Sequence, residues 1–204
     1  CKDDTFCIVG PDADLIMLGL VSGVEKFYIL REDMSNSDKQ YFVNIQEFRK
    51  SIHATFKGKT KSQSILDFVF ICCLLGNDFV PPIPGLEIRN NGIEFLLHAY
   101  QVSGALVNTK TLRINRSSFL LLLRELLPNT KQAIMLKYKN RAKYYRDTIL
   151  EKNCSDRGLR YKEYKADYYA KSQDTTDNLV PRYLQGLQFV IIYYARGLPD
   201  WTWY

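Results

Sequence analysis

Two aspartates, Asp12 and Asp14, lie between a Gly-Pro pair at residues 10–11 and an apolar run at residues 15–20. The run before them, residues 5–9, contains β-branched and aromatic side chains, which is typical of a buried strand that ends at the Gly-Pro turn. In open α/β sheets, ligands bind at the carboxyl ends of strands. Two neighbouring carboxylates repel each other unless a cation lies between them, and a set of oxygen ligands favours Mg²⁺ or Mn²⁺. The pattern therefore indicates a divalent metal site, and the alternative is a helix cap that binds no ion.

Asp78 is the third candidate ligand because it closely follows a segment, residues 64–75, that is apolar almost all round. Such a segment predicts a helix buried in the core, and a Gly-Asn pair followed by prolines predicts where it stops. Asp78 would then be held at the edge of the core, with a solvated turn residue as the alternative. Asp12, Asp14 and Asp78 could together hold one or two divalent ions, to which Asn77 could add an oxygen ligand or a hydrogen bond.

Asp67 belongs to the same predicted helix but is not a ligand of the same site. Eleven residues separate Asp67 from Asp78, which is roughly 16 Å along a helix. We therefore expect Asp67 to be a buried residue that accepts hydrogen bonds.

The elements that must position these carboxylates begin with a βαβ unit. Residues 5–9 predict a strand, residues 12–20 a helix and residues 26–30 the next strand, which implies a parallel pairing. The pattern then predicts, in order, a polar turn at 31–40, a short strand at 41–43, a helix from a cap at Asn44 to about Phe56, the buried helix at 64–75, a helix at 91–102 and a short extended segment at 106–114.

The chain changes character after residue 115, where an all-helical part is expected. This part is predicted to contain a helix from Arg116 that ends at Pro128, a long basic helix at 130–150, a polar break at 153–158 and helices at 161–171 and 179–195. The expected fold class is α/β, with a partial, mostly parallel sheet and flanking helices in residues 1–115, followed by a helical segment in residues 116–204.

Composition excludes several classes of protein. The chain has 204 residues, of which 46% are hydrophobic, as expected for a globular protein with a real core. Its longest apolar run, residues 68–75, is far shorter than the roughly 20 residues that span a membrane. The N-terminal residues, from Cys1 onward, contain no initiator Met and neither the basic n-region nor the apolar h-region of a signal peptide. We therefore expect a fragment of an intracellular protein. Five cysteines without C-x-x-C spacing predict buried free thiols, and two histidines without a serine or cysteine motif give little support for a nucleophilic triad.

Positive charge is concentrated in one stretch of the chain. The whole chain has a net charge of +6, whereas residues 129–171 alone contain 12 basic and 5 acidic residues. The same stretch contains seven tyrosines: Tyr138, Tyr144, Tyr145, Tyr161, Tyr164, Tyr168 and Tyr169. Basic side chains interleaved with aromatic ones could hold a phosphate backbone and stack on bases. The alternative is a pair of exposed helices whose charges are solvated and whose tyrosines pack on one face.

Four blocks of the sequence resemble the XRN-type 5′→3′ exoribonucleases, a family with a cytoplasmic mRNA-decay branch and a nuclear branch. The blocks are Gly10–Leu20, Ile29–Glu32, Leu66–Ile93 and Tyr183–Tyr204. They occur in the order of the family and are spread over nearly the whole chain. The block with Gly-Asn-Asp-Phe and the last block, with its Trp-x-Trp pair, are the most specific.

The resemblance implies a nuclease core of the PIN/FEN type that hydrolyses RNA from a 5′-monophosphate end, with two Mg²⁺ or Mn²⁺ ions as cofactors. Asp12, Asp14 and Asp78 correspond to acidic metal-binding residues of the family. Trp201 and Trp203 match an aromatic block that borders the RNA path, where they could stack on bases or act as packing anchors.

The chain also departs from the family pattern. Pro11 stands where the family usually has Leu and Pro82 where it usually has His, and neither change affects a matched carboxylate. Arg31 matches the family, but no catalytic role is assigned to it. The first acidic residues of the family, its Glu pair and its pocket for the 5′-phosphate would all precede Cys1. The resemblance therefore implies that a missing N-terminal part of the same chain completes the site, and that this fragment alone is inactive.

The expected partner is RNA with a 5′-monophosphate, with no membrane involved, and both cytoplasm and nucleus are compatible with the sequence. Two other functions stay open. A nuclease-derived scaffold could hold RNA or a protein without cutting it. A nucleotide-sugar transferase could use its D-x-D aspartates to bind Mg²⁺ on a diphosphate, but this function does not explain the Gly-Asn-Asp block or the Trp-x-Trp pair.

Overall fold

The structure of the chain is a computed structural model that describes residues 4–33, 36–141, 146–171 and 176–203. The chain forms two compact units, which are described separately. The sheet unit consists of Cys1–Phe70, Val107–Arg113 and Phe189–Tyr204, and the helical unit consists of Ile71–Leu106 and Ile114–Gln188. The expected division of the sequence into residues 1–115 and 116–204 stays a prediction.

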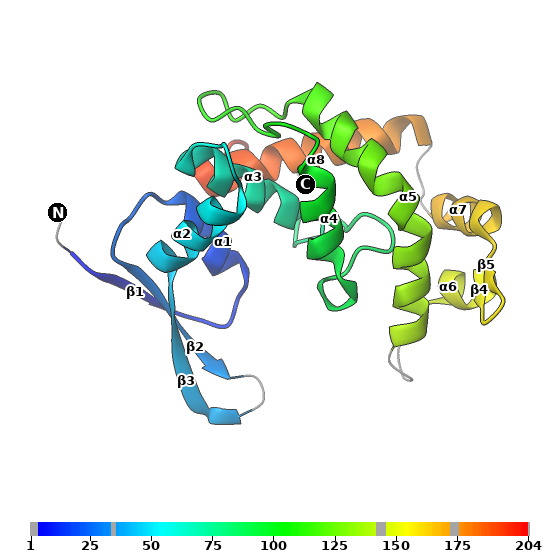
Figure 1. Cartoon of the computed structure of the whole chain (residues 1–204), viewed down its shortest axis with the longest axis horizontal. Coiled ribbons are helices and arrows are strands. Elements are labelled where there is room, and N and C mark those ends of the chain that lie inside the picture. The colour runs from blue at the N-terminus through cyan, green and yellow to red at the C-terminus, as the bar shows by residue number, and fades with distance from the viewer. Residues whose placement is uncertain (1–3, 34–35, 142–145, 172–175, 204) are drawn as a thin grey trace. The chain divides into compact units, whose positions relative to one another are not determined.

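The sheet unit contains a small mixed sheet of three strands, in the order β1-β2-β3 (Figure 1). β1 (Phe6–Val9) pairs in parallel with β2 (Phe27–Asp33), and α1 (Asp14–Val21) connects them, so the predicted βαβ unit is confirmed. All four residues of β1 are exposed, so the expectation that this strand is buried is wrong. β3 (Asn36–Asn44) pairs with β2 in the antiparallel direction. The expectation of a mostly parallel sheet and of a polar turn at residues 31–40 is therefore wrong. Only two residues separate β2 from β3, and a parallel crossover needs a dozen or more.

Two helices, α2 and α3, bury the apolar residues next to this sheet. α2 (Ile45–Thr55) begins at the predicted cap, where the Asn44 side chain accepts hydrogen bonds from the backbone amides of Gln46 and Glu47 at 3.0 and 3.2 Å. In α3 (Lys61–Cys73), Phe68 packs edge-on against Phe48, with ring centroids 5.7 Å apart. Ile29 of β2 and Ile45 of α2 are fully buried, and Ile52 of α2 is nearly so, so part of the core of the sheet unit lies between β2 and α2.

Asp67 is fully buried in α3, as expected. Its Oδ1 accepts hydrogen bonds from the Val107 amide at 3.0 Å and from Gln63 Nε2 at 2.9 Å. The carboxylate therefore satisfies the backbone of a distant segment, which makes Asp67 a structural residue.

The helical unit is built on one long helix, α5 (Arg116–Asn140), which contains Pro128. The prediction that a helix ends at Pro128 is wrong. Proline in a helix interior costs about 3 kcal/mol, but most helical stability in proteins comes from packing of the apolar face. Leu122 and Leu126 before the proline and Ile134 after it are buried, so tertiary contacts on both sides favour one continuous helix.

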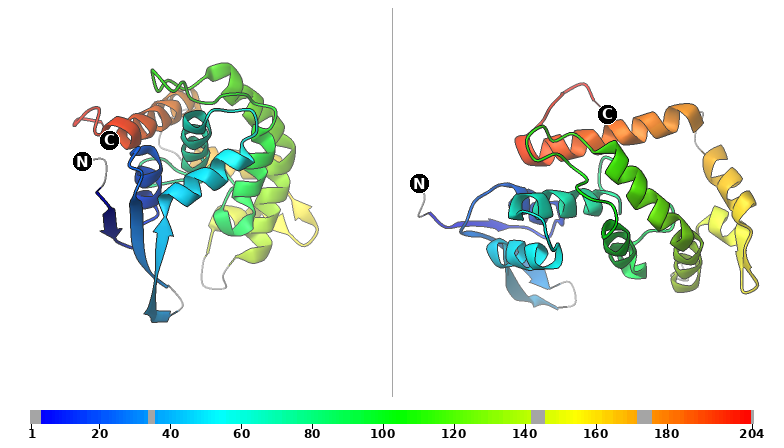
Figure 2. Two further views of the ribbon diagram at one scale, coloured as in Figure 1. Left: turned by 60° about the vertical axis from the view of Figure 1, so that its left-hand side comes forward. Right: turned by 45° about the horizontal axis from the view of Figure 1, so that its top comes forward.

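Smaller elements complete the helical unit. They are the 3-10 helix η1 (Ile88–Asn90), α4 (Gly92–Tyr100), α6 (Thr148–Asn153), β4 (Cys154–Ser155), β5 (Gly158–Leu159), α7 (Tyr161–Ala170) and α8 (Thr176–Arg196), of which the last also contributes to the sheet unit. Figures 1 and 2 show α6 and α7 beside the C-terminal half of α5. The predicted polar break at 153–158 is largely a two-stranded antiparallel hairpin, because β4 pairs with β5.

Most tyrosines of the basic stretch are packing residues. Ile134, Leu150, Cys154 and Tyr164 form a buried cluster, against which Tyr138, Tyr161 and Tyr168 pack as partly buried neighbours. Tyr144 and Tyr145 lie outside the described residues. Within the described part of this stretch, the packing agrees with the alternative of helices whose tyrosines face inward.

The four described cysteines are free thiols, as the sequence predicts, but only Cys73 and Cys154 are buried: Cys72 is partly buried and Cys7 is exposed, so the expected burial is wrong for Cys7. Burial raises the pKa of the Cys72 thiol to about 12. Within the described ranges, no helix is both long enough and apolar enough to cross a lipid bilayer.

Candidate metal centre

Asp12 and Asp14 lie together in the turn between β1 and α1. The turn leaves the sheet after Gly10, whose amide donates to the Leu30 carbonyl at 3.1 Å. Asp12 is exposed, and its Oδ1 accepts a hydrogen bond from the Asp14 amide at 2.8 Å. This bond closes a local turn before α1, whose N-cap residue is Ala13 and has no side-chain cap hydrogen bond. One carboxylate oxygen is engaged in this way, and the second oxygen of Asp12 is available to a ligand.

Arg31, for which the sequence suggested no role, holds this turn. Its guanidinium donates from Nη2 to the carbonyl of Pro11, the residue immediately before Asp12. Arg31 is on β2, next to the strand residue that binds Gly10. The backbone of the turn is therefore tied to β2 at two consecutive residues, which restricts where the Asp12 carboxylate can point.

Arg49 on α2 holds the other end of α1. It is only 3% exposed, and its guanidinium donates to the carbonyls of Gly19, Leu20 and Val24 at 2.5, 2.9 and 2.6 Å. The last carbonyls of a helix have no partner within the helix, so Arg49 satisfies groups that would otherwise be buried and unpaired. Burial lowers the pKa of Arg49. Its position was detectable in the sequence, because Ile45, Arg49 and Ile52 are spaced for one face of a helix, and that face is buried.

Asp78 lies in a tight turn after α3. The neighbouring Asn77 accepts hydrogen bonds at Oδ1 from the amides of Phe79 and Val80, at 2.9 and 3.0 Å. Of the two roles expected for the Asn77 oxygen, a metal ligand or a hydrogen-bond acceptor, the structure shows the acceptor, which shapes the turn. Asp78 itself is exposed. Gly76 precedes the turn with a φ of +90°, and a Cβ there would lie 2.8 Å from Pro82 Cδ.

The structure brings Asp12 and Asp14 into one turn of the sheet unit, whereas Asp78 belongs to the helical unit. Among the described residues, no group of three or more His, Cys, Asp or Glu side chains that could hold a metal ion occurs. Asp12 and Asp78 are each exposed on a short, hydrogen-bonded turn, and carboxylate oxygens are the type of ligand that suits Mg²⁺ or Mn²⁺. A site shared by all three carboxylates stays a prediction.

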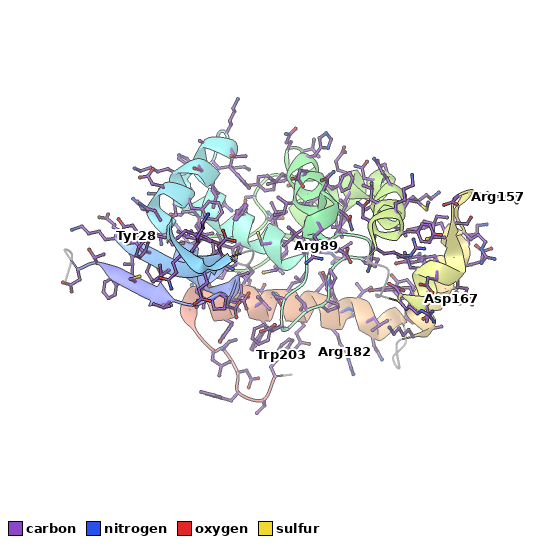
Figure 3. All side chains as sticks on the ribbon, turned by 90° about the horizontal axis from the view of Figure 1, so that it is seen from below. Tyr28, Arg89, Arg157, Asp167, Arg182 and Trp203 are labelled. Atoms are coloured by element: carbon purple, nitrogen blue, oxygen red, sulfur yellow. The ribbon has the colours of Figure 1, made fainter. Side chains whose placement is uncertain are left out.

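The two tryptophans near the end of the chain differ in environment. Trp203 stacks on Phe189 of α8, with ring centroids 4.1 Å apart and planes at 17° (Figure 3). Trp201 is 90% exposed. Asp200 fixes the turn between them, because its Oδ1 accepts from both the amide and the hydroxyl of Thr202 at 2.8 Å, and these bonds lower the pKa of Asp200. Trp203 therefore packs on Phe189, and base stacking stays a prediction for both tryptophans.

Two family models match the chain. A model described as "XRN 5'-3' exonuclease N-terminus" matches residues 1–33, which include β1, α1 and β2. A model described as "Xrn1 helical domain" matches residues 59–158. The two matches together cover about two thirds of the chain.

Several curated relatives are similar over part of the chain. The 5'-3' exoribonuclease 2 of Yarrowia lipolytica is 33% identical over 111 residues, which is 47% of this chain and 11% of that protein. The enzyme of the same name from Saccharomyces cerevisiae is 33% identical over 135 residues, 48% of this chain and 13% of that protein. The 5'-3' exoribonuclease 1 of Schizosaccharomyces pombe is 32% identical over 144 residues, 59% of this chain and 11% of that protein. The chain thus spans little more than a tenth of the length of these relatives. Both family models and all three relatives indicate the same family, and the chain belongs to the XRN family of 5′→3′ exoribonucleases.

Proposed function

We propose that this chain is the middle part of a 5′→3′ exoribonuclease that hydrolyses RNA phosphodiesters from a 5′-monophosphate end. Asp12, Asp14 and Asp78 would hold two Mg²⁺ or Mn²⁺ ions. The observation that carries the proposal is the exposed Asp12 carboxylate at the carboxyl end of β1, in a βαβ unit that matches an exonuclease model. The relatives supply the substrate class, because they are exoribonucleases by name.

Asp12, Asp78 and Arg31 have definable tasks in the proposed site. When bound, two divalent ions would activate water and stabilise the leaving oxygen of the phosphodiester. Asp12 and Asp78 would supply carboxylate oxygens from turns whose backbones are held by hydrogen bonds. Arg31 would fix the direction of the Asp12 carboxylate through the Pro11 carbonyl. A rigid turn matters because ligands must be placed before the RNA arrives.

The site would be completed by another part of the same protein, within a nuclease core of the PIN/FEN type. β1 supports this proposal because it is an edge strand that exposes apolar side chains on both of its faces: Phe6 is 47% exposed, Ile8 40% and Val9 73%. Continuous apolar strands with a parallel partner are typical of sheets that are buried on both faces, whereas natural edge strands often carry charged side chains, which β1 lacks. A strand from the rest of the nuclease would cover this edge.

Trp201 would extend the site toward the RNA. An indole that is 90% exposed and held by a hydrogen-bonded turn can stack on a base without first losing a packing contact. Trp203 would instead keep the segment attached to α8 through Phe189.

Metal-ligand variants of the full-length protein test the proposal. Asp12→Asn and Asp78→Asn each remove a charge while keeping the shape of the side chain, so kcat on 5′-monophosphorylated RNA is expected to fall by at least about 100-fold, the upper end of losses seen for groups that only orient ligands. Asp156→Asn, in the exposed β4–β5 turn, is the matched control and should leave kcat unchanged. RNA binding without any metal-dependent turnover in the wild type would favour the scaffold function instead.

A further inference from the structure

A polar network within the helical unit connects the segment that carries Asp78 to α5. We call residues 74–91, between α3 and α4, the Asp78 loop. Asn140 on α5 donates from Nδ2 to Asn90 Oδ1 at 2.8 Å, and Asn90 donates from Nδ2 to Glu87 Oε2 at 2.9 Å. The Lys137 ammonium, also on α5, lies 3.1 Å from Glu87 Oε1. Both oxygens of the Glu87 carboxylate are therefore bound, and Asn90 is only 4% exposed.

Lys137 extends this network to α6. Its ammonium also lies 3.6 Å from Asp147 Oδ2, and Asp147 caps α6 by accepting from the Leu150 amide at Oδ1, at 3.0 Å. The Lys137 side chain is 20% exposed, so water screens this pair of contacts less than it screens an ordinary surface salt bridge. One cation of the basic stretch thus links the Asp78 loop to two helices.

The backbone of the Asp78 loop also packs directly on α5. Gly85 has a φ of +86°, and a Cβ there would lie 2.8 Å from Ile134 Cγ1 and 2.9 Å from the Ile134 amide nitrogen. At its other end, the loop is tied to the end of α3 by a hydrogen bond from the Ile83 amide to the Leu74 carbonyl at 3.0 Å. The turn with Asp78 lies between Leu74 and Ile83, and the chain reaches its first contact with α5 two residues after Ile83, at Gly85.

We propose that Lys137 is a positioning residue for Asp78, acting through Glu87. This inference rests on the proposed function of Asp78 as a metal ligand. Without the ammonium, Glu87 would keep a half-buried carboxylate with one donor fewer, and the loop would relax away from α5. A shift of about 1 Å in a group that supports catalysis can cost about 100-fold in rate. The basic helical segment then has a task in the nuclease that requires no contact with RNA.

Kinetic variants at Lys137 in the full-length enzyme separate positioning from RNA binding. Lys137→Met is expected to lower kcat and to raise the Mn²⁺ concentration for half-maximal activity, each by about 10-fold, as for other groups that orient metal ligands. KM for RNA and its dependence on salt should stay unchanged, because a phosphate contact would alter both. Lys137→Arg should keep most of the activity. Lys139→Met, which removes an exposed lysine of the same helix, is the matched control and should behave as wild type.

A double-mutant cycle with Glu87→Gln tests the route of the effect. If Lys137 acts through Glu87, Lys137→Met should lower kcat much less in the Glu87→Gln background than in the wild type. Independent losses that multiply would overturn the proposal. An increased KM with a smaller salt dependence would also overturn it, because Lys137 would then be a phosphate contact.

Two further measurements keep the test decisive. Amide hydrogen exchange over residues 77–86 should become faster in Lys137→Met than in Lys139→Met. Equal protection from exchange in the two variants would contradict the proposal whatever the activity.

If Lys137→Met does not fold, Asn140→Ala cuts the network at its other end. It should give the same loss of kcat and of protection from exchange, and unchanged values would reject the positioning role of Lys137. Asp78→Asn is measured in parallel: if it keeps full activity, the proposed function itself fails, whereas a loss in Asp78→Asn alone rejects only the role of Lys137.

Discussion

Replacing Gly76 by alanine tests whether catalysis depends on the exact backbone path that leads to Asp78. A Cβ at this position would lie 2.8 Å from Pro82 Cδ and 3.0 Å from Pro82 N. Ordinary van der Waals contact begins at 3.4 Å, so the loop must move by about 0.6 Å. A proline ring cannot rotate away as a flexible side chain can. The φ of +90° adds roughly 1–2 kcal/mol of backbone strain, and overpacking adds roughly 1–3 kcal/mol.

Gly58→Ala is the matched control, because Gly58 has a φ of +74° but no atom lies within 4 Å of the position that its Cβ would take. We expect Gly58→Ala to lower the free energy of unfolding by roughly 1–2 kcal/mol and to leave kcat unchanged. Gly76→Ala should lower it by roughly 2–5 kcal/mol and reduce kcat by up to about 100-fold through displacement of Asp78. Urea unfolding and steady-state turnover of 5′-monophosphorylated RNA by the full-length protein measure the two quantities. An unchanged kcat in Gly76→Ala would refute the reasoning.

Two further predictions concern the arginine behind the Asp12 turn and a carboxylate of the helical unit. Arg31→Lys removes the planar guanidinium next to the Pro11 carbonyl, so kcat should fall about 10-fold with little change in Tm, and wild-type kinetics would exclude a positioning role. Hydrogen bonds from Asn153 and then Lys152 lower the pKa of Asp167 (Figure 3) below its ordinary 3.8. Because the pKa is lower in the folded state, the stabilisation is present at pH values above 3.8 and is lost as the pH falls through the lowered value. The difference in Tm between wild type and Asp167→Asn should therefore close in acid, and a constant difference would contradict this assignment.

Features encoded by neighbouring residues were predictable from the sequence. The Gly-Pro turn with its aspartates, the βαβ unit and the Asn44 cap are confirmed because their signals are contained within a few consecutive residues. Burial of Asp67 was also predictable, since an aspartate inside an apolar helix must find hydrogen-bond donors.

Features that depend on partners far along the chain were not predictable in this way. β3 contains polar residues that suggested a turn, but pairing with β2 satisfies their backbone groups. Pro128 has a strong local preference to end a helix, yet buried residues on both sides of it keep α5 continuous. In both cases the energy of tertiary contacts exceeds the local preference.

The sequence alone determined the chemistry of the candidate site: which carboxylates exist, on which turns they lie and which family they resemble. Tertiary structure alone decided what holds those turns. Arg31 contacts Pro11 across 20 residues of chain, and Asn140 contacts Asn90 across 50. Neither pair leaves a periodic or local signal, because a side-chain hydrogen bond between distant segments depends on how the intervening chain folds. The local sequence thus names the candidate ligands, and contacts between distant residues hold the segments of chain that carry them.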